Sequence, residues 1–118
     1  MFVHLLLEGF SDGSLGVALD IVGTTAHFSR SGRAPLSASK RELMQRVASI
    51  DGEPVRSSAG RTMPVDGAFN VRSLRAQDVV LVPGMFSAGG RTVDDLLERE
   101  DIHRASGLLA KASARGWW

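Results

Sequence analysis

The chain has 118 residues, a formal net charge of +1 and no cysteine. This length predicts one domain with a buried core, and the near-neutral charge gives no electrostatic reason to expect binding to nucleic acid or to an anionic membrane. The lack of thiols excludes disulfides, thiolate metal ligands and a cysteine nucleophile within these residues. No apolar run reaches membrane-spanning length, and the apolar start lacks the features of a signal peptide, so we expect a cytoplasmic protein with no membrane partner.

The first part of the chain predicts a strand, a helix and a second strand. Residues 2–7 (FVHLLL) form a continuous apolar run, which is typical of a strand covered on both faces. Serine and aspartate at 11–14 are suited to cap a helix, and apolar residues recur every three or four positions over 15–26. A polar connection over 29–42 leads to a strand within 43–51, which ends at an Asp-Gly turn.

The second part predicts a hairpin, a strand and a helical region. Residues 54–67 suggest two short strands around an Ala-Gly turn, and residues 68–77 suggest a short helix or a loop. The run at 79–82 predicts a second fully buried strand. Thr92 is suited to cap a helix, and residues 102–116 form another amphipathic helix that ends at a glycine. This order of elements predicts an α/β fold with a mostly parallel sheet flanked by helices.

Two predicted strands end at glycines. Glu8 and Gly9 follow the first strand, and Pro83, Gly84 and Met85 follow the strand at 79–82. Ligands of open α/β sheets bind beyond the carboxyl ends of the strands. A Pro-Gly break can expose backbone N–H groups that bind a carboxylate or an oxyanion. The alternative interpretation is that Pro-Gly only ends the strand.

Four segments together resemble the N-terminal part of a DJ-1/PfpI-type domain (class I glutamine-amidotransferase-like). More narrowly, they resemble the sensor domains fused to AraC-type helix-turn-helix transcription regulators. The segments are VHLLLEGFSDGSLGVALDIV, ASIDGEPVRSSAGRTMPVDG, DVVLVPGM and REDIHRASGLLAKASARG. The resemblance implies a flavodoxin-like body of the DJ-1/PfpI type, of which residues 1–118 are an incomplete, N-terminal portion.

The resemblance also indicates which functional parts we expect to be missing. In the family, the strand after the ARG segment leads to the nucleophile elbow with its reactive cysteine, and this chain stops at Trp117-Trp118, where that strand is expected. We therefore expect the elbow half and the helix-turn-helix domain to be absent. Aligning Gly9 with the family's glycine places Ser14 where enzymes of the superfamily carry a glutamate. Glu8 precedes the glycine and is not a clean substitute.

Other candidate groups lack the partners that chemistry needs. His4, His27 and His103 show no metal-ligand spacing; His4 is expected in the core, and the other two on helix surfaces. The serines have no base placed nearby. The SAGG segment at 87–90 lacks both the lysine of a phosphate-binding loop and a full dinucleotide fingerprint. We therefore expect no catalytic residue, no metal and no cofactor in this chain.

Two classes of function remain. The first is a ligand-sensing and dimerisation domain of an AraC-family regulator, non-catalytic in this chain, which would contact DNA only through a helix-turn-helix domain outside it. The alternative is a fragment of a DJ-1/PfpI-superfamily enzyme (an amidase, hydratase or glyoxalase-like protein) that lacks its cysteine.

In the sensing domain, a small polar effector would bind near Glu8, Gly9, Ser14, Gly84 and Met85. A sheet that ends before its elbow strand should expose an apolar edge and a helix face, which predicts a homo-oligomer, including one with exchanged segments.

Overall fold

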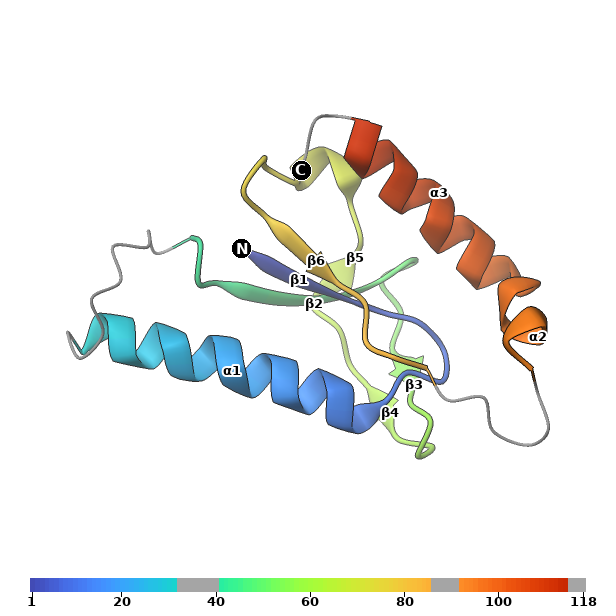
Figure 1. Ribbon diagram of the computed structural model, residues 1–118, viewed down its shortest axis with the longest axis horizontal. Coiled ribbons are helices and arrows are strands. Elements are labelled where there is room, and N and C mark those ends of the chain that lie inside the picture. The colour runs from blue at the N-terminus through green and yellow to red at the C-terminus, as the bar shows by residue number, and fades with distance from the viewer. Residues whose placement is uncertain (32–40, 86–91, 115–118) are drawn as a thin grey trace.

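The computed structural model describes residues 1–31, 41–85 and 92–114. Within them, a four-stranded sheet lies between helices, with strand order β5-β2-β1-β6 and every pairing parallel (Figure 1). In chain order the elements are β1 (Phe2–Leu6), α1 (Asp12–Arg30), β2 (Gln45–Ser49), β3 (Val55–Arg56), β4 (Thr62–Met63), β5 (Gly67–Ala68), the 3-10 helix η1 (Val71–Ser73), β6 (Val79–Leu81), α2 (Val93–Leu97) and α3 (Glu100–Ala114). The predicted α/β class with a mostly parallel sheet is confirmed.

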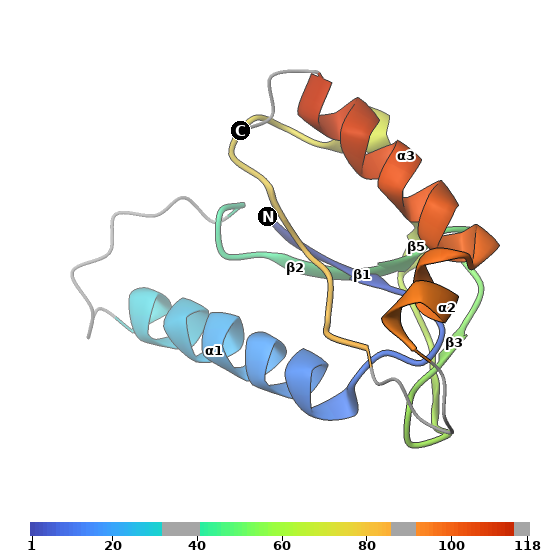
Figure 2. The same ribbon diagram turned by 45° about the vertical axis from the view of Figure 1, so that its right-hand side comes forward.

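Strand β1 is the centre of the fold. It pairs with β2 on one side and with β6 on the other. Because side chains alternate along a strand, Leu5 packs into the cluster that includes Ala105 of α3, while Leu6 packs into the cluster that includes Leu15 of α1. Figures 1 and 2 show α1 and α3 on opposite faces of the sheet. This arrangement explains why β1 is apolar at every position except His4.

Helix α1 follows the predicted pattern. The side chain of Ser11 caps it by accepting from the backbone N–H of Ser14 at 3.3 Å. The helix buries Leu15, Val22 and Ala26, at the predicted spacing. It continues to Arg30, so the first residues of the predicted polar connection are helical instead. Residues 32–40 of that connection lie outside the described residues.

The hairpin β3–β4 is confirmed as an antiparallel pair, and its turn contains Gly60 at φ 80°. Strand β5 was not predicted from the sequence. It has only two residues and forms because Gly67 and Ala68 align with Ala48 and Ser49 of β2. A two-residue strand carries no periodicity, so its existence depends on the tertiary pairing alone.

The prediction that residues 79–82 are fully buried is wrong. Val79 and Val82 are 40% and 41% exposed. The reason is the position of β6 at the edge of the sheet, because among the described residues it pairs only with β1. A strand at an edge keeps one side open to solvent however apolar its sequence is.

The C-terminal helices agree with their sequence signals. Thr92 and Asp95 form a reciprocal capping box at the start of α2. Ala105 and Ala112 of α3 are buried, and Ile102 and Leu109 pack partly buried against the core, as the predicted stripe requires. The glycine predicted to end this helix lies outside the described residues.

Histidine 4 lies in the core, as predicted, and is fully buried. Its Nε2 lies 2.8 Å from Oε1 of Gln45, and Gln45 Nε2 donates to the carbonyl of Leu19 at 3.1 Å. This relay links β1, β2 and α1. His27 and His103 are exposed on helices, also as predicted.

The turn after β2 depends on glycine. Gly52 has φ 83°, and a Cβ there would lie 3.1 Å from the backbone N of Ala68 in β5. We expect Gly52→Ala to lower the free energy of unfolding by about 1–3 kcal/mol, because it adds backbone strain and a backbone clash.

Gly107→Ala is the matched control: it lies in α3, and the position that its new methyl group would take has no neighbouring atom within 4 Å. It should instead stabilise the protein by about 0.5–1 kcal/mol. Urea unfolding measures both changes, and equal midpoints would contradict this account of the turn.

Candidate functional site

The candidate site lies at the carboxyl ends of β1 and β6. These strands are neighbours, but the chain leaves β1 through α1 on one face, while α2 and α3 follow β6 on the other (Figure 2). Such a reversal of connections is where open α/β sheets form their ligand crevice. Gly9 turns the chain at φ 83°, which favours glycine, and Phe10 follows it fully buried. The site therefore starts from a tight turn anchored by an aromatic side chain.

Backbone contacts hold the two strand ends together. The N–H of Ser11 donates to the carbonyl of Gly84 at 2.7 Å, and Phe10 forms an antiparallel bridge with Met85. Phe10 also forms a parallel bridge with Ser57, just after β3. The carbonyl of Gly84 is thus occupied by the helix-capping residue, and the segment after β6 is fixed against the start of α1.

Ser14 and Gly84 are close neighbours in this arrangement. A Cβ placed on Gly84 would lie 3.7 Å from Ser14 Oγ. Both residues are exposed, and Ser14 lies in the first turn of α1. The structure therefore brings together Ser14, Gly84 and Met85, three of the residues predicted from the sequence, beside the positive end of a helix dipole.

Glu8 belongs to a different part of the edge. Its Oε2 accepts from the backbone N–H of Arg56 at 3.4 Å, and its carbonyl accepts from Arg99 Nη2 at 2.9 Å. The side chain lines a pocket of about 260 Å³ whose lining includes none of the other four predicted residues. Glu8 and the Ser14–Gly84 pair thus lie in two separate surroundings, linked by the turn at Gly9.

Acidic side chains surround the pocket beside Glu8. The backbone N–H of Glu53 is the main cause that lowers the pKa of Asp51; burial opposes it, and the Ser49 hydroxyl and the charge of Arg104 add to it. Burial tends to raise the pKa of Asp101, but the hydrogen bond and charge of Arg99 outweigh it and lower that pKa. Arg99 Nε donates to Asp101 Oδ1 at 2.9 Å. These carboxylates already have partners within the protein, which fixes the shape of the pocket wall.

Sequence reasoning missed Arg99, Asp101 and Arg104 at this edge. They come from the segment between α2 and α3 and from α3 itself, and Arg99 lies 91 positions from the carbonyl that it binds. No local spacing signals such a contact. Asp101 lies in the acidic first turn of α3, where the helix dipole favours negative charge.

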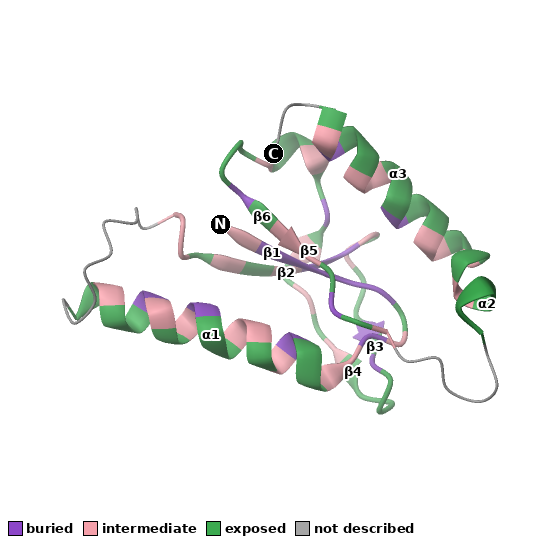
Figure 3. Cartoon of the chain, in the orientation of Figure 1, coloured by how far each residue is buried: buried purple, intermediate pink, exposed green. Residues whose placement is uncertain are grey.

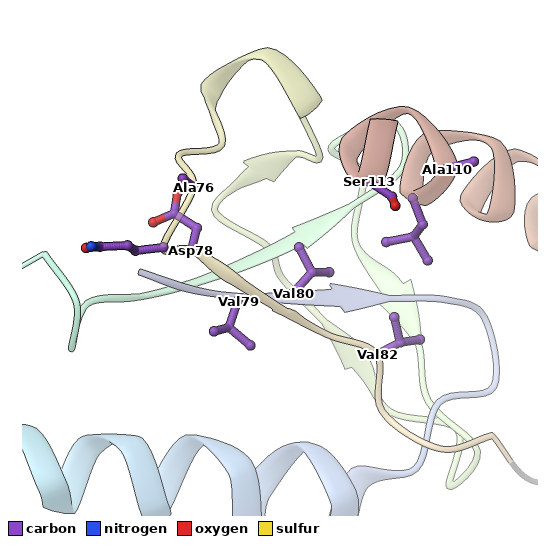
Figure 4. A pocket seen from close by; sticks show the side chains of 9 residues that line it. Ala76, Asp78, Val79, Val80, Val82, Ala110 and Ser113 are labelled. Carbon is purple, nitrogen blue, oxygen red and sulfur yellow. The ribbon is translucent and has the colours of Figure 1, made fainter. Parts of the chain in front are cut away.

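A larger hollow lies away from the predicted site. It has a volume of about 690 Å³ and lies between the outer side of β6 and the C-terminal half of α3, as Figure 4 shows. Its lining includes Val79, Val80 and Val82 from the strand side and Leu109 and Ala110 from the helix. The hollow lies along the side of β6 that has no partner strand among the described residues, and its mostly apolar lining offers few polar groups to orient a small effector.

The described residues hold neither a metal-ligand cluster nor a membrane-spanning helix. Within residues 1–31, 41–85 and 92–114, no group of three or more His, Asp or Glu side chains is placed to hold a metal ion. None of the described helices combines the length and apolar character needed to cross a bilayer. The SAGG segment at 87–90 lies outside the described residues.

Comparison with solved structures finds a protein of similar fold. No family model matches the sequence, and no curated protein matches it. The fold is similar to the crystal structure of an AraC family transcriptional regulator from Pseudomonas putida, with a TM-score of 0.61 and 25% sequence identity. The match covers 98% of this chain and 51% of that one, so the chain spans about half the length of the regulator. Nearly every described element of this protein thus has its counterpart in a transcription regulator of the AraC family.

Proposed function

We propose that this chain is the ligand-sensing portion of an AraC-type transcription regulator and that it is not itself catalytic. The observation that carries the proposal is the similarity to a regulator of that family over 98% of the chain. The sequence resemblance to DJ-1/PfpI-type sensor domains points to the same function. In this proposal the regulator works in the cytoplasm and contacts DNA through a separate helix-turn-helix domain.

The proposed effector site is the surface where β1 and β6 end, at Ser14, Gly84 and Met85; Ser14 and Gly84 are exposed neighbours there. It is supported by the reversal of connections at β1 and β6 and by the exposed N-terminal turn of α1. Helix N-termini and strand-end N–H groups favour a negatively charged group. A small polar metabolite that carries a carboxylate suits this chemistry, with Gly9 and Glu8 shaping the adjacent turn.

The second candidate function is an enzyme of the DJ-1/PfpI superfamily whose cysteine lies beyond these residues. The Pro-Gly break after β6 favours the enzyme, because oxyanion sites use the backbone N–H groups that such a break can expose. Ser14 in place of the family's acidic residue favours the regulator. The coding sequence after residue 118 discriminates between the two: an elbow strand followed by a basic helix-turn-helix region supports the regulator, and an elbow without that region supports the enzyme.

A side chain added at Gly84 tests the effector site. Gly84 is exposed and does not have positive φ, and a Cβ there makes only an ordinary contact with Ser14 Oγ, so adding a side chain strains neither the backbone nor the nearest neighbour. We expect Gly84→Leu to keep the circular dichroism spectrum and lose the thermal stabilisation that a small carboxylic acid from a metabolite panel gives the wild type. At a ligand concentration of 100 times Kd, that stabilisation is about 2.7 kcal/mol.

Gly107→Leu is the matched control, because Gly107 lies on α3 with open space around it. It should respond to the same acids as the wild type does. Retained stabilisation in Gly84→Leu, with the fold intact, would place the effector elsewhere. Absence of any response across the panel in the wild type would count against the sensing role.

A further inference from the structure

Another polar pocket lies on the face of the sheet that α3 covers, beside the start of β1. Its volume is about 230 Å³. Two core side chains of that face, Val3 and Phe69, form part of its wall. We call it the arginine pocket, and its polar lining includes Arg41, Arg46, Asn70 and Ser73. It shares no lining residue with the five residues predicted for the effector site, so it is a separate place in the fold. Figure 3 shows how the exposed and buried residues are distributed over the sheet and its helices.

Arg46 brings a positive charge to this pocket that no acidic side chain balances. It is exposed on β2, and the ion pairs among the described residues do not include it. A Cβ on Gly67 of β5 would lie 2.5 Å from Arg46 Nη2, so the guanidinium packs against bare backbone. Asp66 precedes this glycine, but its carboxylate accepts from the backbone N–H of Val47 at 2.8 Å and does not line the pocket.

Arg41 adds a second guanidinium, which the protein holds in place. Its Nη2 donates to a carboxylate oxygen of Asp78 at 2.7 Å. The same carboxylate lies 3.0 Å from the N-terminal amino group of Met1, so one anion is shared by two cations. The Nε of Arg41 is buried and has no hydrogen-bond partner among the described residues. The pocket is therefore rich in donors and positive charge and poor in acceptors.

Asn70 supplies a neutral donor beside the arginines. Its Oδ1 accepts from the backbone N–H of Arg72 at 3.0 Å and so caps η1. With the carbonyl oxygen engaged in this way, the amide nitrogen of the side chain remains as a donor. Two guanidinium groups and an amide thus line the same small pocket, which is the set of groups that proteins use to hold oxyanions.

We propose that the arginine pocket binds the phosphate group of a small phosphate monoester. Such a group carries a charge of about −1.5 to −2 at neutral pH and offers three oxygen acceptors, which matches two arginines that share a single carboxylate. A water molecule takes roughly 30 Å³ in the liquid, so the pocket has room for a phosphate and a short organic body. The apolar wall at Val3 and Phe69 favours a monoester over inorganic phosphate, because it can cover that body.

This inference does not depend on the proposed effector site. The effector site lies where β1 ends and is expected to take a carboxylic acid, whereas the arginine pocket lies beside the start of β1. The two sites are tested with different ligands and different variants, so either proposal can fail without the other.

Isothermal titration calorimetry of the 118-residue chain with phenyl phosphate, at constant ionic strength, tests the pocket. The wild type should bind saturably. Arg46→Gln removes the unbalanced charge and should weaken binding by about tenfold or more. Arg72→Gln is the matched control, because Arg72 is an exposed arginine of η1 outside the lining. It should bind like the wild type, and circular dichroism checks that both variants fold.

Gly67→Ala tests the position of the Arg46 guanidinium without changing any charge. The new methyl group would lie 2.5 Å from Nη2, so the flexible end of Arg46 must move while the backbone can stay in place. We expect the affinity for phenyl phosphate to fall by about threefold or more, because the donor no longer lies where the pocket needs it. Gly107→Ala, in open space on α3, should leave the affinity unchanged.

Four results would overturn the proposal. The first is a wild type that does not bind phenyl phosphate at millimolar concentration. The second is binding that Arg46→Gln or Gly67→Ala leaves unchanged, because the phosphate would then lie elsewhere. The third is an equal loss in Arg46→Gln and Arg72→Gln, which would indicate general attraction to positive charge. The fourth is tighter binding of inorganic phosphate than of phenyl phosphate, which would contradict a monoester.

Discussion

Leu5→Ala should remove about 2–5 kcal/mol from the free energy of unfolding. Leu5 is fully buried in the middle of β1 and belongs to the cluster that α3 covers. Truncation loses buried apolar surface and leaves a cavity between the sheet and α3. Domains of this size are stable by about 5–15 kcal/mol, so the variant should be marginal at 37 °C. Urea unfolding followed by circular dichroism measures the change.

Leu97→Ala is the matched control, because it makes the same truncation at a leucine of α2 that is 56% exposed. Its effect should stay within about 0.5 kcal/mol. Equal losses in the two variants would show that β1 is not the buried centre of the sheet.

Asp78→Asn should destabilise the protein by about 2–3 kcal/mol, because it breaks a largely buried ion cluster. One carboxylate oxygen of Asp78 lies 3.0 Å from the N-terminal amino group of Met1, and the other lies 2.7 Å from Arg41 Nη2. The second oxygen also accepts from the backbone N–H of Arg75 at 2.8 Å. The variant leaves two cations without their shared anion. Their partial exposure to water reduces the cost below that of a fully buried pair.

The pH dependence of stability gives an independent check on Asp78. Burial tends to raise its pKa, but the hydrogen bonds from Arg75, the N-terminal amino group and Arg41 lower it below the ordinary value of 3.8. A carboxylate with a lowered pKa stabilises the fold above its unfolded pKa, and this contribution is lost as the pH falls through the folded pKa. The wild type should therefore lose stability more steeply than Asp78→Asn as the pH falls below about 4.

Asp94→Asn serves as the control for both measurements, because Asp94 is exposed in the first turn of α2. It should cost less than about 1 kcal/mol. If Asp78→Asn and Asp94→Asn lowered the free energy of unfolding equally at neutral pH, the ion cluster around Asp78 would not stabilise the fold by the expected amount.

The sequence predicted the elements whose signals are local. The apolar run of β1, the stripe of α1 and the helix cap at Thr92 each lie within a few neighbouring residues, and each appears in the structure where expected. Strand β5 was missed because two residues are too few to show the alternation of apolar and polar side chains that predicts a strand. The burial of β6 was overestimated because an apolar run does not reveal whether a strand lies at the centre or at the edge of a sheet.

The candidate site was predictable only in part. Glycines at strand ends identified the edge of the sheet, and the structure places Gly84 beside Ser14 there. The separation of Glu8 from that pair depends on Arg56 and Arg99, which lie 48 and 91 positions away in the chain. Contacts between residues so far apart in the sequence follow from the packing of the whole domain, and no local sequence motif predicts them.

The most direct test of the central claim is a backbone amide NMR titration of this chain with the small carboxylic acids that stabilise it. The account predicts saturable shifts at Gly9, Ser14, Gly84 and Met85, where β1 and β6 end. Shifts that cluster instead along Val79 to Val82 and the C-terminal half of α3, or an unchanged spectrum with every acid, would contradict the assignment of an effector site to the ends of β1 and β6.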